Sequence, residues 1–322
     1  MRRIATMADR CASPDHATQA EPTPHNPQTV AQLLADHWAL HAAEVTLLEG
    51  GMNSLTWEAR SGGTRWVVKV VPPEAEDAFV FGLGLAKRLE RDGIPAGAPV
   101  ATTRGRSVVP FGGQVMALLR WVEGRGLTGE SHTELGVMGS TLARAHRALG
   151  TQDGKGTGPT RLYLPSEHLD VRPWLRPVIT NVMARLDALD LRSLTWGPVH
   201  GDPAPDVFRL DPVSGVCGMI DWSGAGVLPR VYDLAALVMY RGPDSMRPLI
   251  DAYVADGALT HEEVERALHP LLDYRWAGQA AYFAGRIARG DLTGIDGPQV
   301  NEAGLEAARQ WFAARGDDHS GR

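Results

Sequence analysis

Two aspartates, Asp202 and Asp221, lie 19 residues apart in the stretch VHGDPAPDVFRLDPVSGVCGMIDW, residues 199–222. Two strand-like runs, VFRL and VCGMI, are joined by DPVSG, whose early proline and final glycine predict a hairpin. The hairpin would bring both carboxylates side by side at its open end. Adjacent carboxylates repel each other unless a cation lies between them, and a divalent metal is the expected cation. The alternative is that Asp202 only caps a loop and Asp221 only ends a strand.

A glycine-rich turn and a lysine earlier in the chain have the chemistry to bind an anion. The stretch LLEGGMNSLTWEA, residues 47–59, predicts a turn between two strands. Backbone amides in such a turn approach phosphate oxygens closely because glycine has no Cβ, although a plain hairpin turn is the alternative. Lys69 lies inside the apolar run WVVKV, so it either reaches solvent from an edge strand or points into a cleft toward an anion. The turn residues of interest are Gly50, Gly51, Asn53 and Ser54.

Two regions of different character must position these residues. Over residues 29–122 a helix is followed by strand-like runs, glycine-rich turns and one further helix, which predicts a mainly β N-lobe. Over residues 123–316 helical periodicity dominates, including two helices at 261–272 and 276–289, so a mainly α C-lobe is expected. Together they predict an α+β fold with two lobes. Residues 1–28 and 317–322 are predicted to be disordered tails.

Composition limits the class of protein and its partners. The 322 residues are 43% hydrophobic and carry a net charge of -6, so a globular protein that binds no nucleic acid is expected. The N-terminal residues lack an apolar signal core and no run of 18 apolar residues occurs, which predicts a cytoplasmic protein without membrane contact. Cys11 and Cys217 predict neither a disulfide framework nor a zinc site. We expect a monomer or a homodimer.

The order of these motifs resembles that of the aminoglycoside phosphotransferase-like kinases, a family with the two-lobed protein-kinase-like fold. The resemblance covers roughly residues 35–290. VHGD is similar to the family's catalytic loop, MIDW to its metal-binding aspartate, and VYDLAALV to the helix that follows. LLEGGMNSLTWEA resembles the phosphate loop, WVVKV the lysine strand, LLRWVEGRGL the interlobe hinge and LARAHRAL the helix before the catalytic loop. The other common phosphate signature, G-x-x-x-x-G-K-[ST], is absent.

The resemblance implies a phosphotransferase that uses ATP, or GTP, and Mg²⁺ to phosphorylate a hydroxyl group of a small molecule. Asp202 would orient that hydroxyl or accept its proton, Asp221 would hold Mg²⁺, and Lys69 would bind the α- and β-phosphates. The glycine-rich turn would cover the triphosphate. His200 and Asp233 would hold the catalytic loop, although Asp233 could simply favour the start of its helix. The hinge residues expected to meet the adenine are Leu119, Arg120, Trp121 and Val122.

Two positions depart from the family's pattern. The asparagine that follows the catalytic aspartate by five residues is replaced by Val207, and we predict that the neighbouring Asp206 supplies the second metal ligand. The helix acid that pairs with the lysine is expected near Gly82, where the sequence has none. Glu76 or Glu74 would then reach the lysine, or the pair would be missing. A catalytically degraded nucleotide-binding module is therefore the alternative to an enzyme, and a chain without any nucleotide function is a third hypothesis.

The family's C-terminal helices wall the acceptor site, so aromatic and charged residues there are candidate acceptor contacts, with core packing as the alternative. The resemblance implies an antibiotic acceptor, an aminoglycoside or another hydroxylated natural product, and a role in antibiotic resistance. A metabolite kinase for homoserine, choline or a sugar is the alternative. His37 and His41 have a metal-ligand spacing without the rest of a zinc motif, which predicts a solvated helix face. The candidate acceptor contacts are Asp170, Trp222, Asp273, Tyr274, Trp276, Tyr282, Phe283 and Arg286.

Overall fold

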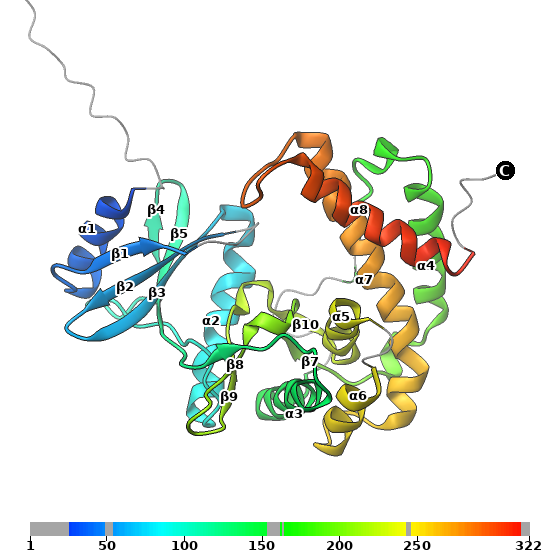
Figure 1. Cartoon of the computed structure of the whole chain (residues 1–322), viewed down its shortest axis with the longest axis horizontal. Helices are drawn as coiled ribbons and strands as arrows, with labels where there is room; N and C mark the ends of the chain where they lie inside the picture. Colours follow the sequence, from blue (N-terminus) through cyan, green and yellow to red (C-terminus); the bar gives the residue numbers. More distant parts are fainter. Residues whose placement is uncertain (1–25, 49–53, 153–161, 163, 243–245, 317–322) are drawn as a thin grey trace, which may run out of the picture.

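The computed structural model describes residues 26–48, 54–152, 162, 164–242 and 246–316. A β-rich N-terminal region is followed by a helical C-terminal region (Figure 1). The predicted α+β fold class with two regions is therefore confirmed. In the described part of the chain no helix is long and apolar enough to cross a membrane.

The N-terminal region is built on an antiparallel sheet with the strand order β1-β2-β3-β5-β4. Its strands are β1 (Glu44–Leu47), β2 (Leu55–Ser61), β3 (Thr64–Val71), β4 (Val109–Phe111) and β5 (Gln114–Arg120). Helix α1 (Pro27–Trp38) covers one face of the sheet. The helix begins where the side chain of Asn26 accepts a hydrogen bond from Gln28 N, and the buried Val30 and Leu34 pack on the sheet.

Alternation along β3 decides which side chains face which side of the sheet. Val68 and Val70 belong to the apolar cluster under α1, so Lys69 points to the opposite face. That opposite face is covered by α2 (Glu76–Arg91), whose Phe79 and Leu83, one turn apart, contact the sheet. Lys69 therefore lies on the side of the sheet that faces the C-terminal region.

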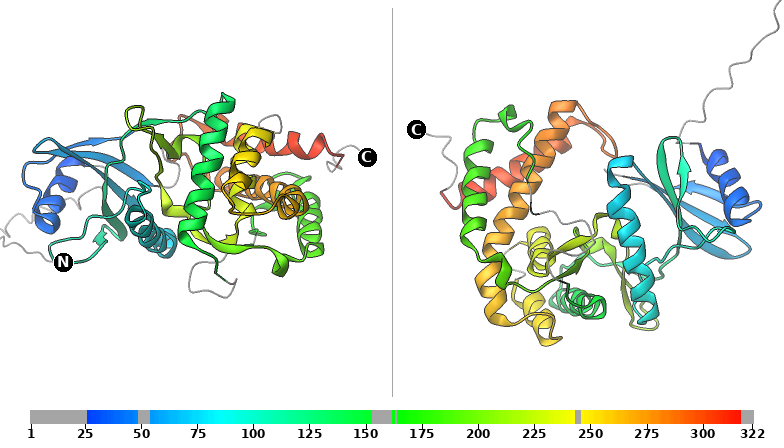
Figure 2. Two further views of the ribbon diagram at one scale, coloured as in Figure 1. Left: turned by 90° about the horizontal axis from the view of Figure 1, so that it is seen from below. Right: turned by 180° about the vertical axis from the view of Figure 1, so that it is seen from behind.

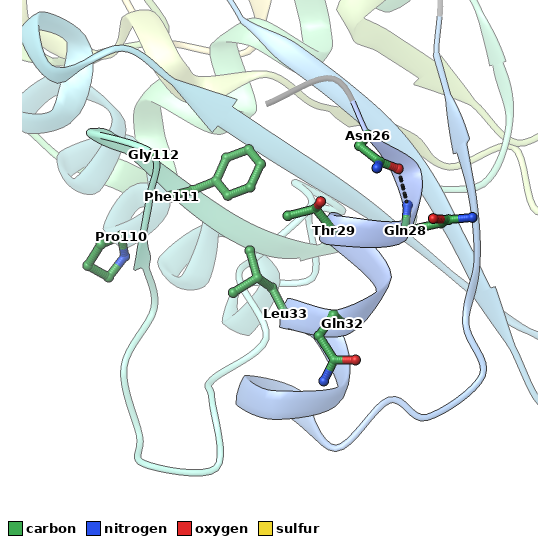
Figure 3. A pocket seen from close by; sticks show the side chains of 8 residues that line it. All are labelled: Asn26, Gln28, Thr29, Gln32, Leu33, Pro110, Phe111 and Gly112. Carbon is green, nitrogen blue, oxygen red and sulfur yellow. Dashed lines mark hydrogen bonds between the residues drawn. The ribbon is translucent and has the colours of Figure 1, made fainter. Parts of the chain in front are cut away.

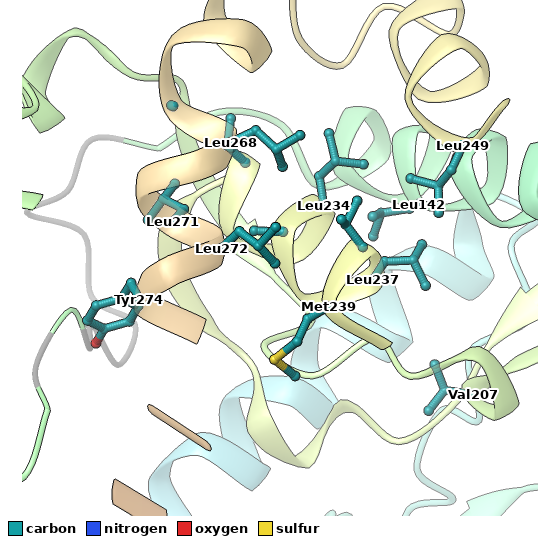
Figure 4. Packing of buried hydrophobic residues seen from close by; sticks show 14 of the residues in the cluster. Leu142, Val207, Leu234, Leu237, Met239, Leu249, Leu268, Leu271, Leu272 and Tyr274 are labelled. Carbon is teal, nitrogen blue, oxygen red and sulfur yellow. The ribbon is translucent and has the colours of Figure 1, made fainter. Parts of the chain in front are cut away.

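Helices make up most of the C-terminal region. α7 packs against α4, α5 and α8, and α3 packs against α6 (Figures 1 and 2). These helices enclose a large apolar core, part of which is drawn in Figure 4. The helices are α3 (His132–Leu149), α4 (Leu175–Ala188), α5 (Val231–Arg241), α6 (Met246–Ala255), α7 (His261–Arg289) and α8 (Pro298–Ala313).

The prediction of two separate helices near the end of the chain was wrong, because α7 is continuous from His261 to Arg289. Pro270 lies inside it and removes one backbone hydrogen bond. Packing on three neighbouring helices keeps the chain helical through this position. Residues 273–275 are consequently on a helix face and not in a connecting loop.

Short strands frame the two aspartates of the opening motif. β8 (Phe208–Leu210) and β9 (Cys217–Met219) form the predicted hairpin. β8 begins one residue later than the predicted run, and β9 is one residue shorter at each end. β6 (Arg125–Gly126) extends this sheet. A second pair, β7 (Trp196–Val199) and β10 (Gly226–Pro229), was not predicted. Since β7 ends just before His200 and β10 begins just after the 222–224 turn, this pair brings the two aspartate loops together.

Helix α2 rests directly on the backbone of the loop that carries Asp221. A Cβ built on Gly82 would lie 1.9 Å from the carbonyl oxygen of Trp222. Such a distance is a collision with backbone, so only glycine permits this approach. Gly82 is the place where the family's pattern led us to expect an acid, and the contact with Trp222 explains why no side chain stands there.

Replacing Gly82 by alanine is expected to lower the free energy of unfolding by about 1–3 kcal/mol, because the methyl group must push α2 off Trp222. The matched control is Gly84→Ala, on the exposed side of the same helix with no atom within 4 Å, which should raise stability by about 0.5–1 kcal/mol. Urea unfolding of both variants measures the difference. Equal stability of the two variants would contradict the close packing.

Candidate active site

Lys69 and Asp221 form an ion pair between the two regions. The Nζ of Lys69 lies 2.5 Å from Oδ1 of Asp221. Lys69 is 5% exposed, so its ammonium group has lost most of its water and relies on this partner. Of the two alternatives for Lys69, the missing helix acid agrees with the structure: Glu74 lies in the short helix before α2, Glu76 begins α2, and both are exposed. Within the described residues, the ion-pair partner of Lys69 is Asp221.

Asp221 stands in a strained turn directly after β9. Its φ of 65° is left-handed, and Oδ1 also accepts a hydrogen bond of 2.6 Å from Ser223 Oγ. Partial burial raises the pKa of this carboxyl, but the charge and hydrogen bond of Lys69 outweigh burial and lower the pKa to about 2. Asp221 is therefore an anion at neutral pH, with its side chain 44% exposed.

The loop of residues 200–202 is fixed by hydrogen bonds to a buried carboxylate. Asp233, in the first turn of α5, is fully buried and accepts the backbone N–H of His200 at 2.6 Å and of Gly201 at 2.9 Å. Neutral His146, whose pKa is lowered by burial, donates from Nε2 to Oδ2 at 3.0 Å. Burial raises the pKa of Asp233, yet these hydrogen bonds and nearby charges hold it below its ordinary value. Asp233 thus organises the loop as an ionised acceptor.

His200 links the two aspartate loops. Its Nε2 lies 2.8 Å from the carbonyl oxygen of Ile220, next to Asp221, and its Nδ1 accepts the backbone N–H of Asp202 at 3.3 Å. The ring packs on Trp222 at a centroid distance of 4.7 Å. Gly201 lets the two loops lie close together, because a Cβ there would be only 2.0 Å from the carbonyl oxygen of Gly224. The loops are in direct backbone contact.

Asp202 is the exposed carboxylate of this arrangement. Its side chain is 55% exposed, and Oδ1 accepts hydrogen bonds from Tyr240 Oη at 2.7 Å and Arg275 at 2.8 Å. Neither Tyr240 nor Arg275 was predicted from the sequence. Each aspartate of the opening motif therefore contacts a cationic side chain, Arg275 for Asp202 and Lys69 for Asp221.

Asp206 and Val207 point in different directions. Val207 is 8% exposed and belongs to the apolar core (Figure 4). Asp206 is exposed on the short helix Pro205–Val207. Burial and the charge of Asp202 raise the pKa of Tyr240, and the charge of Asp206 adds a smaller effect in the same direction. In the described residues no group of three or more His, Cys, Asp or Glu side chains is arranged to hold a metal ion.

The predicted nucleotide-contacting residues fall into two groups. Gly50, Gly51 and Asn53 lie outside the described residues, and Ser54 is half-buried just before β2. The expected hinge residues lie where β5 leaves the sheet toward β6, and the guanidinium of Arg65 lies 3.6 Å from the ring centroid of Trp121. These hinge residues are Leu119, Arg120, Trp121 and Val122.

Three of the predicted acceptor contacts, Trp222, Asp273 and Arg286, are buried and hydrogen-bonded within the protein. Trp222 is 5% exposed and donates to Met219 O, and Asp273 is 7% exposed and accepts from Trp311. Arg286 is 1% exposed and donates to Asn301 Oδ1. The burial of Arg286 agrees with core packing, the alternative explanation of its helical spacing.

The other residues of that prediction vary in exposure. Trp276 stacks on Trp311 at 5.5 Å and Tyr282 packs edge-on against Phe283 at 5.2 Å, all half-buried. Tyr274 is buried, whereas Asp170 is exposed and pairs with Arg176. Their role as acceptor contacts stays a prediction.

Two further features fall outside the candidate active site. α1 ends at Trp38, so His37 and His41 do not share a helix face as expected. A cavity of about 490 Å³ lies between α1 and the β4–β5 turn (Figure 3). It is on the α1 face of the sheet, opposite Lys69, and its lining residues carry no charge.

Comparisons with known proteins agree on one fold. The family model described as "Phosphotransferase enzyme family" matches residues 44–271. An amicoumacin kinase solved with AMP-PNP, Ca²⁺ and its ligand has a TM-score of 0.69 at 16% identity, over 90% of this chain and 94% of that chain. A microcompartment-associated aminopropanol kinase has a TM-score of 0.65 at 15% identity, over 91% and 99%.

A spectinomycin phosphotransferase solved with ADP and spectinomycin is similar as well, with a TM-score of 0.60 at 13% identity, over 90% of this chain and 95% of that chain. No curated protein sequence matches. At these identities the solved structures establish the kinase-like fold, whose β-rich and helical lobes correspond to the two regions described above.

Asp233→Asn is expected to lower the free energy of unfolding by about 2–4 kcal/mol at neutral pH, because an amide replaces a buried anion that accepts two backbone N–H groups. Asp251→Asn, at an exposed position of α6, is the matched control and should change stability by less than about 0.5 kcal/mol.

The effect of Asp233→Asn should depend on pH. An ionised carboxylate whose pKa is lowered by folding stabilises fully above its ordinary pKa of 3.8, and this contribution disappears as the pH falls through the lower folded pKa. The gap between wild type and variant should therefore shrink below about pH 4 in urea unfolding. A gap that stays constant from pH 7 to pH 3 would contradict the ionised state.

Proposed function

Because the chain belongs to the phosphotransferase enzyme family and is a kinase that phosphorylates a hydroxyl group of a small molecule, we propose that its acceptor is a hydroxylated antibiotic and its donor Mg-ATP. The observation that carries this proposal is the meeting of Lys69, Asp221 and Asp202 at one place. The residues come from a strand of the first lobe and two loops of the second. Phosphoryl transfer needs a cation for the phosphates, an anion for the metal and an oriented nucleophile.

The residues present fit a metal-bound nucleotide. Two of the solved kinases to which the chain is similar contain AMP-PNP or ADP, which supports a nucleotide donor, with GTP as the alternative. Asp221 offers an ionised carboxylate, the hard oxygen ligand that Mg²⁺ prefers. When bound, Mg²⁺ would neutralise charge on the phosphates. Lys69 would then exchange Asp221 for the α- and β-phosphates.

Asp202 would act on the acceptor. Its carboxylate is more than half exposed and lies beside the loop that carries Asp221, as expected for a group that must reach both solvent-borne acceptor and phosphate. In this role it orients the attacking hydroxyl and receives its proton. His200 and Asp233 would keep the loop fixed through the hydrogen bonds described above.

Asp206 would supply the second metal ligand that the family obtains from an asparagine. The buried Val207 packs in the apolar core, and the neighbouring Asp206 is exposed on the same short helix. A carboxylate is at least as good a ligand for Mg²⁺ as an amide oxygen. Val207 would thus anchor the loop by packing in the core, and Asp206 would bind the second metal ion.

The choice of an antibiotic rests on the neighbours that act on antibiotics, amicoumacin and spectinomycin kinases, and would make the protein a resistance enzyme. The aminopropanol kinase among the neighbours supports a small amino alcohol as the second candidate. The acceptor distinguishes these two functions, since the phosphoryl chemistry is common to both.

Incubation with Mg-ATP and a panel of aminoglycosides, spectinomycin, amicoumacin, homoserine, choline and aminopropanol is expected to yield one product heavier by a single phosphate. Asp202→Asn should lower kcat about 10²- to 10⁴-fold and leave nucleotide binding intact. Asp187→Asn, exposed on α4, is the matched control and should behave as wild type. Mass spectrometry detects the product, and calorimetry measures nucleotide binding.

Three results would contradict the proposal. Nucleotide binding without phosphorylated product across the panel would favour a non-catalytic nucleotide-binding module. A wild-type rate in Asp202→Asn would show that another group serves the acceptor. A product from aminopropanol or choline alone would show that the acceptor is a metabolite and not an antibiotic.

A further inference from the structure

One oxygen of Asp202 accepts two hydrogen bonds from outside its own loop. Tyr240, in the last turn of α5, and Arg275, in the middle of α7, both donate to Oδ1, at 2.7 and 2.8 Å. A carboxylate oxygen offers about two lone-pair sites, so these two donors saturate Oδ1. The oxygen that remains for a third partner is Oδ2.

Arg275 is itself held by further hydrogen bonds. Its second terminal nitrogen donates to Tyr232 Oη at 2.7 Å and to the carbonyl oxygen of Gly201 at 3.4 Å. Its guanidinium carbon lies 5.2 Å from the ring centroid of Tyr232, and the side chain is 16% exposed. A planar guanidinium held by three partners has little rotational freedom. Tyr232 and Tyr240 lie two turns apart on α5, so one helix secures both donors.

Both donors keep their protons at neutral pH. Burial and the charge of Asp202 raise the pKa of Tyr240 above its ordinary value. Burial alone would lower the pKa of Arg275, but Tyr232 and Asp202 raise it further than burial lowers it. The two hydrogen bonds to Oδ1 therefore persist over the pH range in which an enzyme works.

We propose that Arg275 and Tyr240 are positioning residues, which fix Asp202 through Oδ1 so that Oδ2 faces the acceptor hydroxyl. This inference rests on the proposed function of Asp202. In the reaction the acceptor O–H bond breaks and its oxygen forms a bond to the γ-phosphorus of ATP. The bond from that phosphorus to the β–γ bridging oxygen breaks with its electron pair, leaving ADP, and the acceptor proton goes to Oδ2.

The arrangement predicts a loss of rate and not of nucleotide affinity. A 1 Å error in the position of a reacting group costs about 10²-fold in rate. Hydrogen bonds to charged groups stabilise by about 1.5–3 kcal/mol, which corresponds to about 10- to 100-fold in rate. Because both donors act on one oxygen, removing both should cost less than the product of the two single losses.

The first arm of the test is crystallographic and needs no acceptor. Wild type, Tyr240→Phe and Arg275→Gln are crystallised, and the Asp202 side chain is compared. Wild type should show both donors on Oδ1, and each variant should show a rotated or split Asp202 carboxylate. An unchanged Asp202 carboxylate in both variants would overturn the inference, whether or not the protein phosphorylates anything.

The second arm is kinetic and uses Mg-ATP with whichever acceptor of the panel described under the proposed function gives most product. Each single variant should lower kcat about 10- to 100-fold with the KM for Mg-ATP within about twofold. Arg266→Gln, exposed on the same helix α7, is the matched control and should keep wild-type kcat. Wild-type kcat in Tyr240→Phe and Arg275→Gln would overturn the positioning role. Absence of product in the wild type would instead contradict the proposed function.

Discussion

The ion pair between Lys69 and Asp221 is the interaction on which the rest of the site depends. It joins β3 of the first lobe to the loop after β9 of the second, across 152 residues of sequence. Lys69 has lost most of its water, so removal of either partner would leave an uncompensated charge between the lobes. The same two side chains are the ones that a metal-bound triphosphate would engage, and the pair therefore marks the place where the two lobes meet their ligand.

Close backbone contacts near this ion pair fix the positions of α2 and of the two aspartate loops. Gly82 lets α2 rest on Trp222, and Gly201 lets the Asp202 loop rest on Gly224. Beneath them the buried Asp233 accepts two backbone N–H groups of the loop. A Cβ at Gly82 would collide with the backbone of Trp222, and a Cβ at Gly201 would collide with the backbone of Gly224. The close approach of these segments therefore requires glycine at both positions.

Much of the fold and the core of the site could be predicted from the sequence. The turn residues of DPVSG gave the hairpin, and the change from strand to helix periodicity gave the two lobes. The partner of Lys69 could not be predicted, because it comes from a loop of the other lobe, 152 residues further along the chain. Arg275 was missed because a break was predicted between residues 272 and 276, where α7 continues. An arginine between Tyr274 and Trp276 was the signal, since a charged residue that packs among aromatic side chains needs a partner.

The most direct test of the central claim is a crystal structure of the protein with Mg²⁺ and AMP-PNP. The account predicts Lys69 Nζ in contact with the α- and β-phosphates, a metal ion bound by Asp221 and a second metal ligand from Asp206. Asp202 should lie beside the γ-phosphate. A nucleotide bound elsewhere, or phosphates without contact to Lys69 and Asp221, would contradict the account. Metal bound by Asp221 alone, with Asp206 turned away, would remove Asp206 from the site.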